Sequence, residues 1–488
     1  MAHSLANKAI GPADKGQIET ETNTADVEFG TAVAVMNLKN ADDALAFAGN
    51  ASEPIEYTAE EERAVLRKID WNIVPLLCWV YMIQFADKTS LNYASLMGIR
   101  EDAGLDPNSQ QYSWISSIFY AGYILWDYAA LMTVRFFLGA FEATITPAFV
   151  LFTSIWYKQN EQAQRIGYWL SCNGVALLIM GPIAYGLSGV KNSALPPWEI
   201  LFLMLGLLTV VTGVISIFCM PDNQTNAKFL NTREKRIAID RIRSNHQGIG
   251  NRVWKWDQFW EALRDCRTWL YVLFSLLMNI PNGGITTFGS IVIKSFGVND
   301  RMALLLNMPT GIVDISAKLL FPWISDKLLD RSLPAFIAIL IPMIGGIMMI
   351  VIPLTYKAAL LVGYYMIGAA GSSWCLVMAM ISSNTLGFTK KATVNGLQIL
   401  AYAAGNWIGP QTFRSNDAPD YYYGKLMVAI MYGLAALTLV AIRFVNVVEN
   451  RRRDKAAAEQ SGGAAEVDEG NEFADLTDFQ QKSFRYII

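Results

Sequence analysis

The sequence predicts an all-α polytopic membrane protein. Of its 488 residues, 53% are hydrophobic and 17% are charged, and the mean hydropathy is +0.28. An average soluble domain carries about 25% charged residues, so this composition favours a membrane protein. The apolar residues also gather in runs of roughly 20, which is the length that a helix needs to cross a hydrocarbon core about 30 Å thick.

Five apolar runs lie in the first half of the chain. They cover residues 71–91, 112–128, 135–158, 166–190 and 199–220. Residues 1–59 precede them and are polar without an apolar period, which is typical of a disordered tail. That tail has no basic start followed by an apolar core, so we expect no cleaved signal peptide.

A basic stretch, residues 221–267, divides the chain. It has ten Lys or Arg residues against six Asp or Glu residues, and such loops lie on the cytoplasmic side of a membrane. Six further apolar runs follow it, at residues 268–288, 302–323, 333–354, 358–386, 392–413 and 421–445. The boundaries predict a first bundle at 60–220, a cytoplasmic linker at 221–267, a second bundle at 268–445 and a polar tail at 446–488.

The same composition excludes several classes of protein. The net charge of −3 leaves no basic footprint for nucleic acid. The five cysteines show no CxxC spacing and neither histidine lies in an apolar run, so no metal site and no disulfide framework are expected. No nucleotide-binding loop or activated nucleophile emerges, so we expect neither an enzyme nor a cofactor, apart from protons as a coupling ion.

The run at 135–158 carries the clearest functional signal. Arg135 and Glu142 are seven positions apart, so they lie on one face of the predicted helix. A charge at membrane depth costs at least about 2.5 kcal/mol and normally faces a bundle interior or a water-filled cavity. Arg135 therefore either holds a substrate carboxylate or snorkels to the membrane interface. Glu142 is the candidate proton-coupling residue, because burial raises the pKa of a carboxyl group.

A second pair of charges lies in the run at 302–323. Asp314 and Lys318 are four positions apart and share a helix face. Charges inside a membrane usually pair, so a structural ion pair is the preferred interpretation of these two residues.

Four stretches resemble the major facilitator superfamily, and within it the fungal allantoate permease branch of the anion:cation symporters. The resemblance covers roughly residues 60–453. It rests on RFFLGAFEATITPAFVLFTSIWYK from Arg135, DKTSLNYASL from Asp87, NIPNGGITTFGS from Asn279 and GNWIGPQTFRSNDAPDYYYGK from Gly405. It implies two six-helix bundles around a central cavity, with a substrate site near the midplane and alternating access.

The resemblance also implies roles for individual residues. Asn282, Asn406 and Gln411 would lie on cavity-facing spans and bind substrate, although they could equally join helix to helix. The run SDKLLDR contains Asp326, Lys327 and Arg331 and resembles the family's cytoplasmic loop motif.

The expected function is proton-coupled uptake of a small organic anion or vitamin by a monomer in a plasma membrane. Allantoate, ureidosuccinate, nicotinate and pantothenate are served by proteins of this kind. An anion that enters an inside-negative cell faces about 2.3 kcal/mol per charge per 100 mV, which one accompanying proton cancels. The alternatives are an efflux carrier or antiporter, a non-transporting sensor, and a transport-inactive shortened product.

The shortened product is expected because one span is missing. The family has 12 spans, whereas 11 are visible here, and the third span would lie between residues 128 and 135. If the basic linker is inside, five crossings put the N-terminus outside, together with Arg63, Arg67 and Lys68. One further span returns both tails to the cytoplasm. We therefore expect a mis-spliced or mis-predicted gene or a deletion, and a chain that transports poorly or not at all.

Overall fold

The computed structural model is helical throughout the part of the chain that it describes. The described residues are 57–102, 110–121, 137–142, 144–190, 193–224, 226–243, 254–328, 330–460, 476–481 and 484–488. They form α-helices and short 3-10 turns and no strand, which confirms the predicted fold class.

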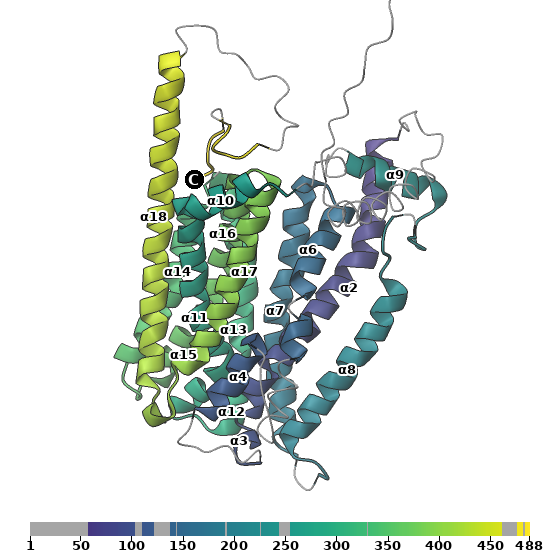
Figure 1. Cartoon of the computed structure of the whole chain (residues 1–488). Helices are drawn as coiled ribbons and strands as arrows, with labels where there is room; N and C mark the ends of the chain where they lie inside the picture. The colour runs from purple at the N-terminus through teal and green to yellow at the C-terminus, as the bar shows by residue number, and fades with distance from the viewer. Residues whose placement is uncertain are drawn as a thin grey trace, which may run out of the picture.

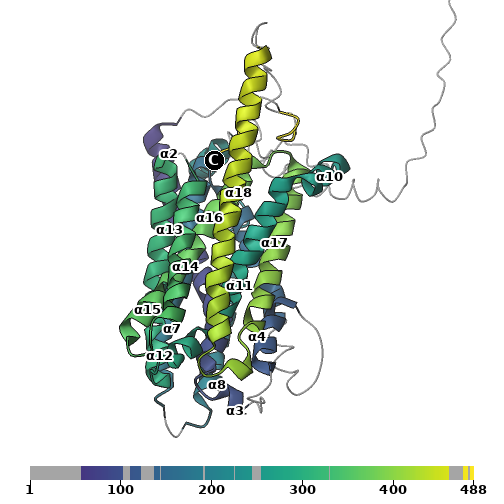
Figure 2. The same cartoon turned by 90° about the vertical axis from the view of Figure 1, so that its left-hand side faces the viewer.

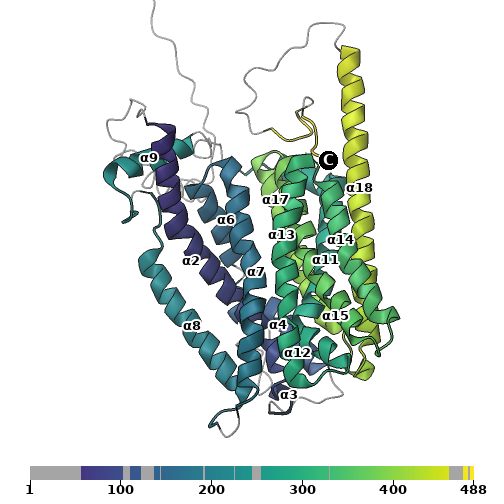
Figure 3. The same ribbon diagram turned by 180° about the vertical axis from the view of Figure 1, so that it is seen from behind.

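The helices fall into two groups that follow the chain. The first group is α2 (Ala59–Ala94), α3 (Ile99–Asp102), α4 (Gln111–Ala121), α6 (Ile145–Trp156), α7 (Gln159–Leu187) and α8 (Pro197–Cys219). The second group is α11 (Cys266–Ser295), α12 (Asp300–Leu306), α13 (Met308–Leu328), α14 (Ser332–Val351), α15 (Lys357–Met366), α16 (Ala370–Asn384), α17 (Phe388–Gln411) and α18 (Tyr422–Gln460). The two groups stand side by side, with α8 and α18 on opposite flanks (Figures 1 and 3).

Eight of the described helical segments are long and apolar enough to cross a membrane. The predicted count of 11 spans is therefore not confirmed. Helix α17 has 24 residues but carries Lys390, Lys391, Asn395 and Gln398, so its composition is too polar for that count. Helix α4 is described over 11 residues, up to Ala121, where this described range stops, so it does not enter that count.

The helix that contains the predicted first span is longer than that span. We expected a short amphipathic stretch before a span at 71–91, whereas α2 is one helix of 36 residues. It begins at a capping box in which Thr58 accepts a hydrogen bond from the backbone of Glu61 and Glu61 accepts one from the backbone of Thr58. The helix therefore starts well before the predicted first crossing.

The linker and the tail also contain helices that the sequence did not predict. Residues 221–267 include α9 (Thr232–Arg243) and α10 (Trp256–Arg264), and α18 continues to Gln460, past the predicted span end at residue 445. Figure 2 shows α18 extending beyond its neighbours. Parts of the predicted polar tail are packed, since Asp478 and Tyr486 are 1% and 2% exposed.

The start of α2 lies on the same side of the molecule as α9, α10 and the end of α18 (Figure 1). An ion pair joins Lys68 to Glu234 of α9, and Arg233 lies 3.1 Å from Glu61. An even number of crossings, with α2 itself included, therefore lies between the start of α2 and α9. Residues 122–136, where the missing third span would fall, lie outside the described residues, so its absence stays a prediction.

The two groups of helices approach each other closely along α7 and α13. A Cβ atom added to Gly174 of α7 would lie 2.5 Å from the carbonyl oxygen of Gly311 of α13. Only glycine permits this backbone approach. A second contact joins α2 to α11, where the backbone N–H of Ser290 donates to Asn92 at 2.8 Å. These contacts place α2, α7, α11 and α13 at the interface between the halves.

Candidate functional site

Three asparagines form a hydrogen-bonded cluster between α11 and α17. Asn282 Nδ2 donates to Asn406 Oδ1 at 2.9 Å, and Asn406 Nδ2 donates to Asn279 Oδ1 at 3.2 Å. Asn406 is 0% exposed and Asn279 is 3% exposed, whereas Asn282 is partly exposed. The sequence predicted Asn282 and Asn406 separately as substrate-binding residues, and the structure brings them into direct contact.

Glycines allow this cluster to form. A Cβ atom on Gly283 would lie 2.5 Å from the carbonyl oxygen of Asn406, and one on Gly409 would lie 2.3 Å from that of Ile280. Real Cβ atoms essentially never come that close, so a larger residue at either position would force the helices apart. The register of α11 against α17, and with it the asparagine pair, depends on these two positions.

Lys88 links the other half of the molecule to this cluster. Its Nζ atom donates to the Tyr402 hydroxyl oxygen at 3.1 Å and lies 5.6 Å from the centre of the Tyr402 ring. Tyr402 is one turn before Asn406 on α17, and its carbonyl oxygen accepts from Asn406 Nδ2 at 2.9 Å. Lys88 and Tyr402 are both partly exposed. An ammonium group, a phenol and a primary amide thus lie together between the halves.

Asp87 points away from its neighbour Lys88. Its Oδ2 atom accepts from Thr209 of α8 at 2.7 Å, and the residue is 8% exposed. Successive residues on a helix point about 100° apart, so Lys88 reaches α17 while Asp87 reaches α8. The two charges are therefore assigned to different surfaces of α2.

The predicted pair on the run at 135–158 is only half described. Glu142 is 7% exposed and lies in the described helical residues 137–142, which precede α6. Arg135 lies outside the described residues, so its proposed contact with substrate stays a prediction. The role of Glu142 in proton coupling likewise stays a prediction.

Gln411 lies at the end of α17 and is partly buried. It follows Asn406 by five residues, which is about 140° around a helix. Gln411 therefore lies on a different face of α17 from Asn406, and its role in substrate binding stays a prediction.

Asp314 and Lys318 form an ion pair at the interface between the halves. Lys318 Nζ lies 2.8 Å from Asp314 Oδ2 and donates to the carbonyl oxygen of Leu170 in α7 at 3.3 Å. Lys318 is 8% exposed. The pair therefore joins α13 to α7, close to the Gly174 contact.

The predicted loop motif lies at the far end of α13, away from the asparagine cluster. Lys327 Nζ lies 3.9 Å from the ring centre of Trp323. Arg331 donates to the carbonyl oxygen of Ala379 in α16 at 2.6 Å and to Ser383. Asp326 belongs to the last turn of α13, and its side chain lies outside what the structure describes. Arg331 thus ties the α13–α14 connection to α16.

Sequence reasoning missed Lys88 and Tyr402 as site residues. The signal for Lys88 was present, because an ionisable residue inside an apolar run is a candidate site by default. Tyr402 gave no such signal, since aromatic residues in membrane helices usually pack. Their contact joins positions 314 residues apart, which no local pattern reveals.

Comparisons with known proteins identify the family that the chain resembles. The family model of the Major Facilitator Superfamily matches residues 124–410. The chain is 35% identical to the allantoate permease of Saccharomyces cerevisiae, with 99% of this chain and 98% of the relative covered. It is 36% identical to an uncharacterized transporter of Schizosaccharomyces pombe, with 89% and 91% covered.

A solved structure shares the fold. It is a bacterial homolog to the human lysosomal transporter Spinster in an inward-facing and occupied conformation, with a TM-score of 0.54 and 14% identity. The likeness covers 76% of this chain and 96% of that chain.

The alignment with the allantoate permease is longer than this chain. It extends over 538 positions, whereas the chain has 488 residues, so at least 50 positions carry a residue of the relative alone.

Proposed function

The chain belongs to the Major Facilitator Superfamily, and on that premise we propose that it carries a small carboxylate into the cell together with a proton. The chain is an integral membrane transporter of a small molecule, and not an enzyme. The direction, the coupling ion, the carboxylate and a plasma-membrane location are the proposed parts.

The observation that carries the proposal is the position of Lys88. Its ammonium group lies between the halves, 3.1 Å from the Tyr402 hydroxyl oxygen. Asn406 donates to the carbonyl oxygen of Tyr402 and accepts from the amide of Asn282, so these groups lie close together. These groups offer N–H and O–H donors around one positive charge, which suits an ionised carboxylate. We assign substrate contact to Lys88, Tyr402 and Asn282, which are partly exposed, and the positioning of Asn282 to the fully buried Asn406.

Proton coupling is proposed for Glu142, with Arg135 as a second carboxylate contact. A buried carboxyl group that is protonated on one side of the membrane and ionised on the other carries one proton per cycle. With a monoanion this makes transport electroneutral, and each unit of pH difference then supplies about 1.4 kcal/mol, or tenfold accumulation. The relative named allantoate permease supports uptake of such an anion.

The test is uptake of labelled small carboxylates at external pH of about 5 and about 7. We expect the carboxylate to outcompete its amide analogue and to enter faster at the lower pH. Preference for the amide, or a rate indifferent to pH, would refute the proposal. A competition panel of allantoate, ureidosuccinate, nicotinate and pantothenate would then select the substrate.

A second candidate is a transport-inactive shortened form. It is favoured by the alignment positions that this chain lacks. We propose that the missing residues include the third span. The test inserts the corresponding residues of the allantoate permease between Tyr128 and Arg135 and compares uptake by the two chains. Full transport by the uninserted chain, with a cytoplasmic N-terminus, would refute this candidate.

A further inference from the structure

The end of the chain folds back onto the second half of the molecule. After α18 ends at Gln460, residues 476–481 and 484–488, here called the tail segment, lie against the end of this half that carries α10 (Figure 1). Thr477, Asp478 and Tyr486 of the tail segment are 0%, 1% and 2% exposed. Such burial is unusual for a charged residue unless it has partners.

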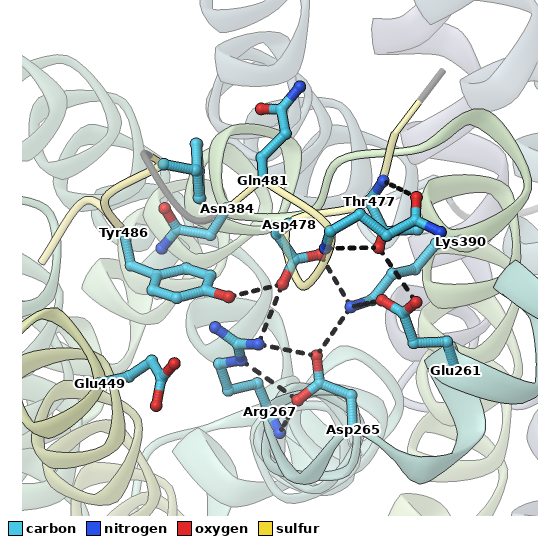
Figure 4. A network of polar contacts seen from close by, with 12 residues as sticks. Glu261, Asp265, Arg267, Asn384, Lys390, Glu449, Thr477, Asp478, Gln481 and Tyr486 are labelled. Atoms are coloured by element: carbon cyan, nitrogen blue, oxygen red, sulfur yellow. Dashed lines mark hydrogen bonds and ion pairs between the residues drawn. The ribbon is translucent and has the colours of Figure 1, made fainter. Parts of the chain in front are cut away.

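Asp478 is held by cations from two different helices. Its carboxylate lies 2.9 Å from Nη2 of Arg267 on α11 and 2.7 Å from Nζ of Lys390 on α17, and it accepts a hydrogen bond from the Tyr486 hydroxyl at 2.7 Å (Figure 4). The aromatic side chains of the tail segment cover the same cations. The Arg267 guanidinium lies 3.8 Å from the Tyr486 ring centre, and Lys390 Nζ lies 3.9 Å from that of Phe479.

The binding site remains charge-balanced without the tail segment. Asp265 Oδ2 lies 3.1 Å from Arg267 Nη2 and 3.2 Å from Lys390 Nζ. Glu261 Oε1 lies 2.9 Å from Lys390 Nζ. We call the protein outside the tail segment the body. Two carboxylates of the body therefore face the two cations, in addition to Asp478 of the tail segment. Release of the tail segment leaves no uncompensated buried cation, so docking can be reversible.

Two asparagines of the body recognise the backbone of the tail segment. Asn384 Nδ2 donates to the carbonyl oxygen of Ile487 at 2.8 Å and Asn384 Oδ1 accepts from its N–H at 2.8 Å. Asn450 makes the same two-way contact with Tyr486, at 2.8 and 2.9 Å. A side-chain amide presents one donor and one acceptor as a neighbouring strand would. The body thus binds the tail segment as a peptide.

The contacts described above come from four helices of the second half and from α10 of the linker. Glu261 lies on α10, Arg267 on α11, Asn384 on α16, Lys390 on α17 and Asn450 on α18. Asn384 and Lys390 flank the turn between α16 and α17, so the docked tail segment fastens this turn to α11 and α18. In addition, Thr477 donates a hydrogen bond to Glu261 at 3.0 Å, which attaches α10.

We propose that this end of the second half is a peptide-binding site whose ligand is the chain's own tail segment, and that docking restrains the turn between α16 and α17. The chemistry of the site fits an acidic peptide with an aromatic residue beside the acid. The site is distinct from the one at Lys88, and the proposal does not depend on the substrate.

The first test measures tail release in the full-length protein. Trypsin cleavage at Arg485 should be at least about tenfold faster in Asp478→Asn than in the wild type, because a hydrogen bond to a buried charge is lost. Asn450→Ala, which changes the body instead of the tail, should also speed cleavage. Glu459→Gln changes an exposed charge on α18 and should leave the rate unchanged. Equal rates for Asp478→Asn and Glu459→Gln would overturn the proposal.

The second test supplies the ligand separately. A fluorescent peptide with the sequence of residues 476–488 should bind full-length Asp478→Asn protein in detergent at least about tenfold more tightly than wild-type protein, whose own tail competes. The same peptide carrying Asp478→Asn should bind neither protein. Amide exchange in residues 385–387 should be faster in the Asp478→Asn protein and slow again with the wild-type peptide. Equal binding of both peptides, or unchanged exchange, would overturn the proposal.

Discussion

The ammonium group of Lys88 on α2 lies 3.1 Å from the hydroxyl oxygen of Tyr402 on α17, so a cation of the first half donates a hydrogen bond to the second half. In a transporter that works by moving its halves, such a contact is made in some conformations and broken in others. An ammonium group carries three N–H donors, so in the proposed site Lys88 can donate to Tyr402 and to a carboxylate at the same time. The proposed substrate would then bind at a contact that joins the two halves.

The first prediction concerns Lys88. Lys88→Ala should weaken binding of the carboxylate by about ten- to a hundredfold, since a hydrogen bond to a charged group contributes about 1.5–3 kcal/mol. Lys88→Arg should retain more affinity, because it keeps the charge. Lys294→Ala is the matched control, since Lys294 pairs with Asp300 at the exposed end of α11. Substrate-induced thermal stabilisation measures binding, and equal loss in Lys88→Ala and Lys294→Ala would contradict the assignment.

The second prediction separates binding from coupling at Glu142. Glu142→Gln keeps the size of this 7% exposed side chain but cannot release a proton. Exchange of labelled for unlabelled substrate should continue, whereas accumulation driven by a pH difference should be lost. Exchange and accumulation are measured in the same vesicles. These vesicles contain the span-restored chain, which carries the inserted allantoate permease residues between Tyr128 and Arg135. Parallel loss of both would assign Glu142 to structure instead.

The third prediction tests the glycine contact between α11 and α17. Gly409→Ala places a Cβ atom 2.3 Å from the carbonyl oxygen of Ile280 and should destabilise the protein by about 1–3 kcal/mol. Gly396→Ala lies on the same helix with nothing within 4 Å, so it should be neutral or stabilise slightly through helix propensity. Thermal unfolding in detergent compares the two. A similar loss in both variants would show that helix packing is not the cause.

The fourth prediction concerns pH and the tail segment. Burial raises the pKa of Asp265, but the charges of Arg267 and Lys390 outweigh it and hold that pKa below its usual value. A lowered pKa in the folded state means that Asp265 stabilises the site above the unfolded value of about 3.9, and that this stabilisation is lost as the pH falls through the folded value. Trypsin-like proteases fail in acid, so amide exchange of residues 385–387 is the measurement. Because Asp265 keeps its charge in this range, we expect amide exchange in residues 385–387 to stay unchanged between about pH 7 and about pH 5. Faster exchange at about pH 5 would contradict this assignment.

Much of the fold could be predicted from local sequence because hydropathy is a local property. The runs at 166–190 and 199–220 correspond to α7 and α8, and six apolar runs of the second half all became helices. The ion pair between Asp314 and Lys318 was also visible, since four positions on one helix fix their proximity. These expectations needed no knowledge of how one helix packs on another.

The site and the tail segment depend on contacts between distant positions. Asn282 meets Asn406 only because Gly283 and Gly409 set the register of two helices, and Lys88 meets Tyr402 only because the halves close on one another. Asp478 lies in the stretch that was predicted only as a polar tail, and its partners Arg267 and Lys390 are far away in the sequence. Local pattern therefore could not predict these pairs.

The most direct test of proton-coupled uptake is the external pH itself. Unbuffered, energised cells expressing the span-restored chain receive a pulse of the carboxylate while a pH electrode records the medium. Symport predicts that the medium becomes more alkaline by about one proton per carboxylate taken up, and that Glu142→Gln abolishes this change without abolishing exchange. Accumulation of the carboxylate with acidification of the medium, or with no change of its pH, would contradict the account.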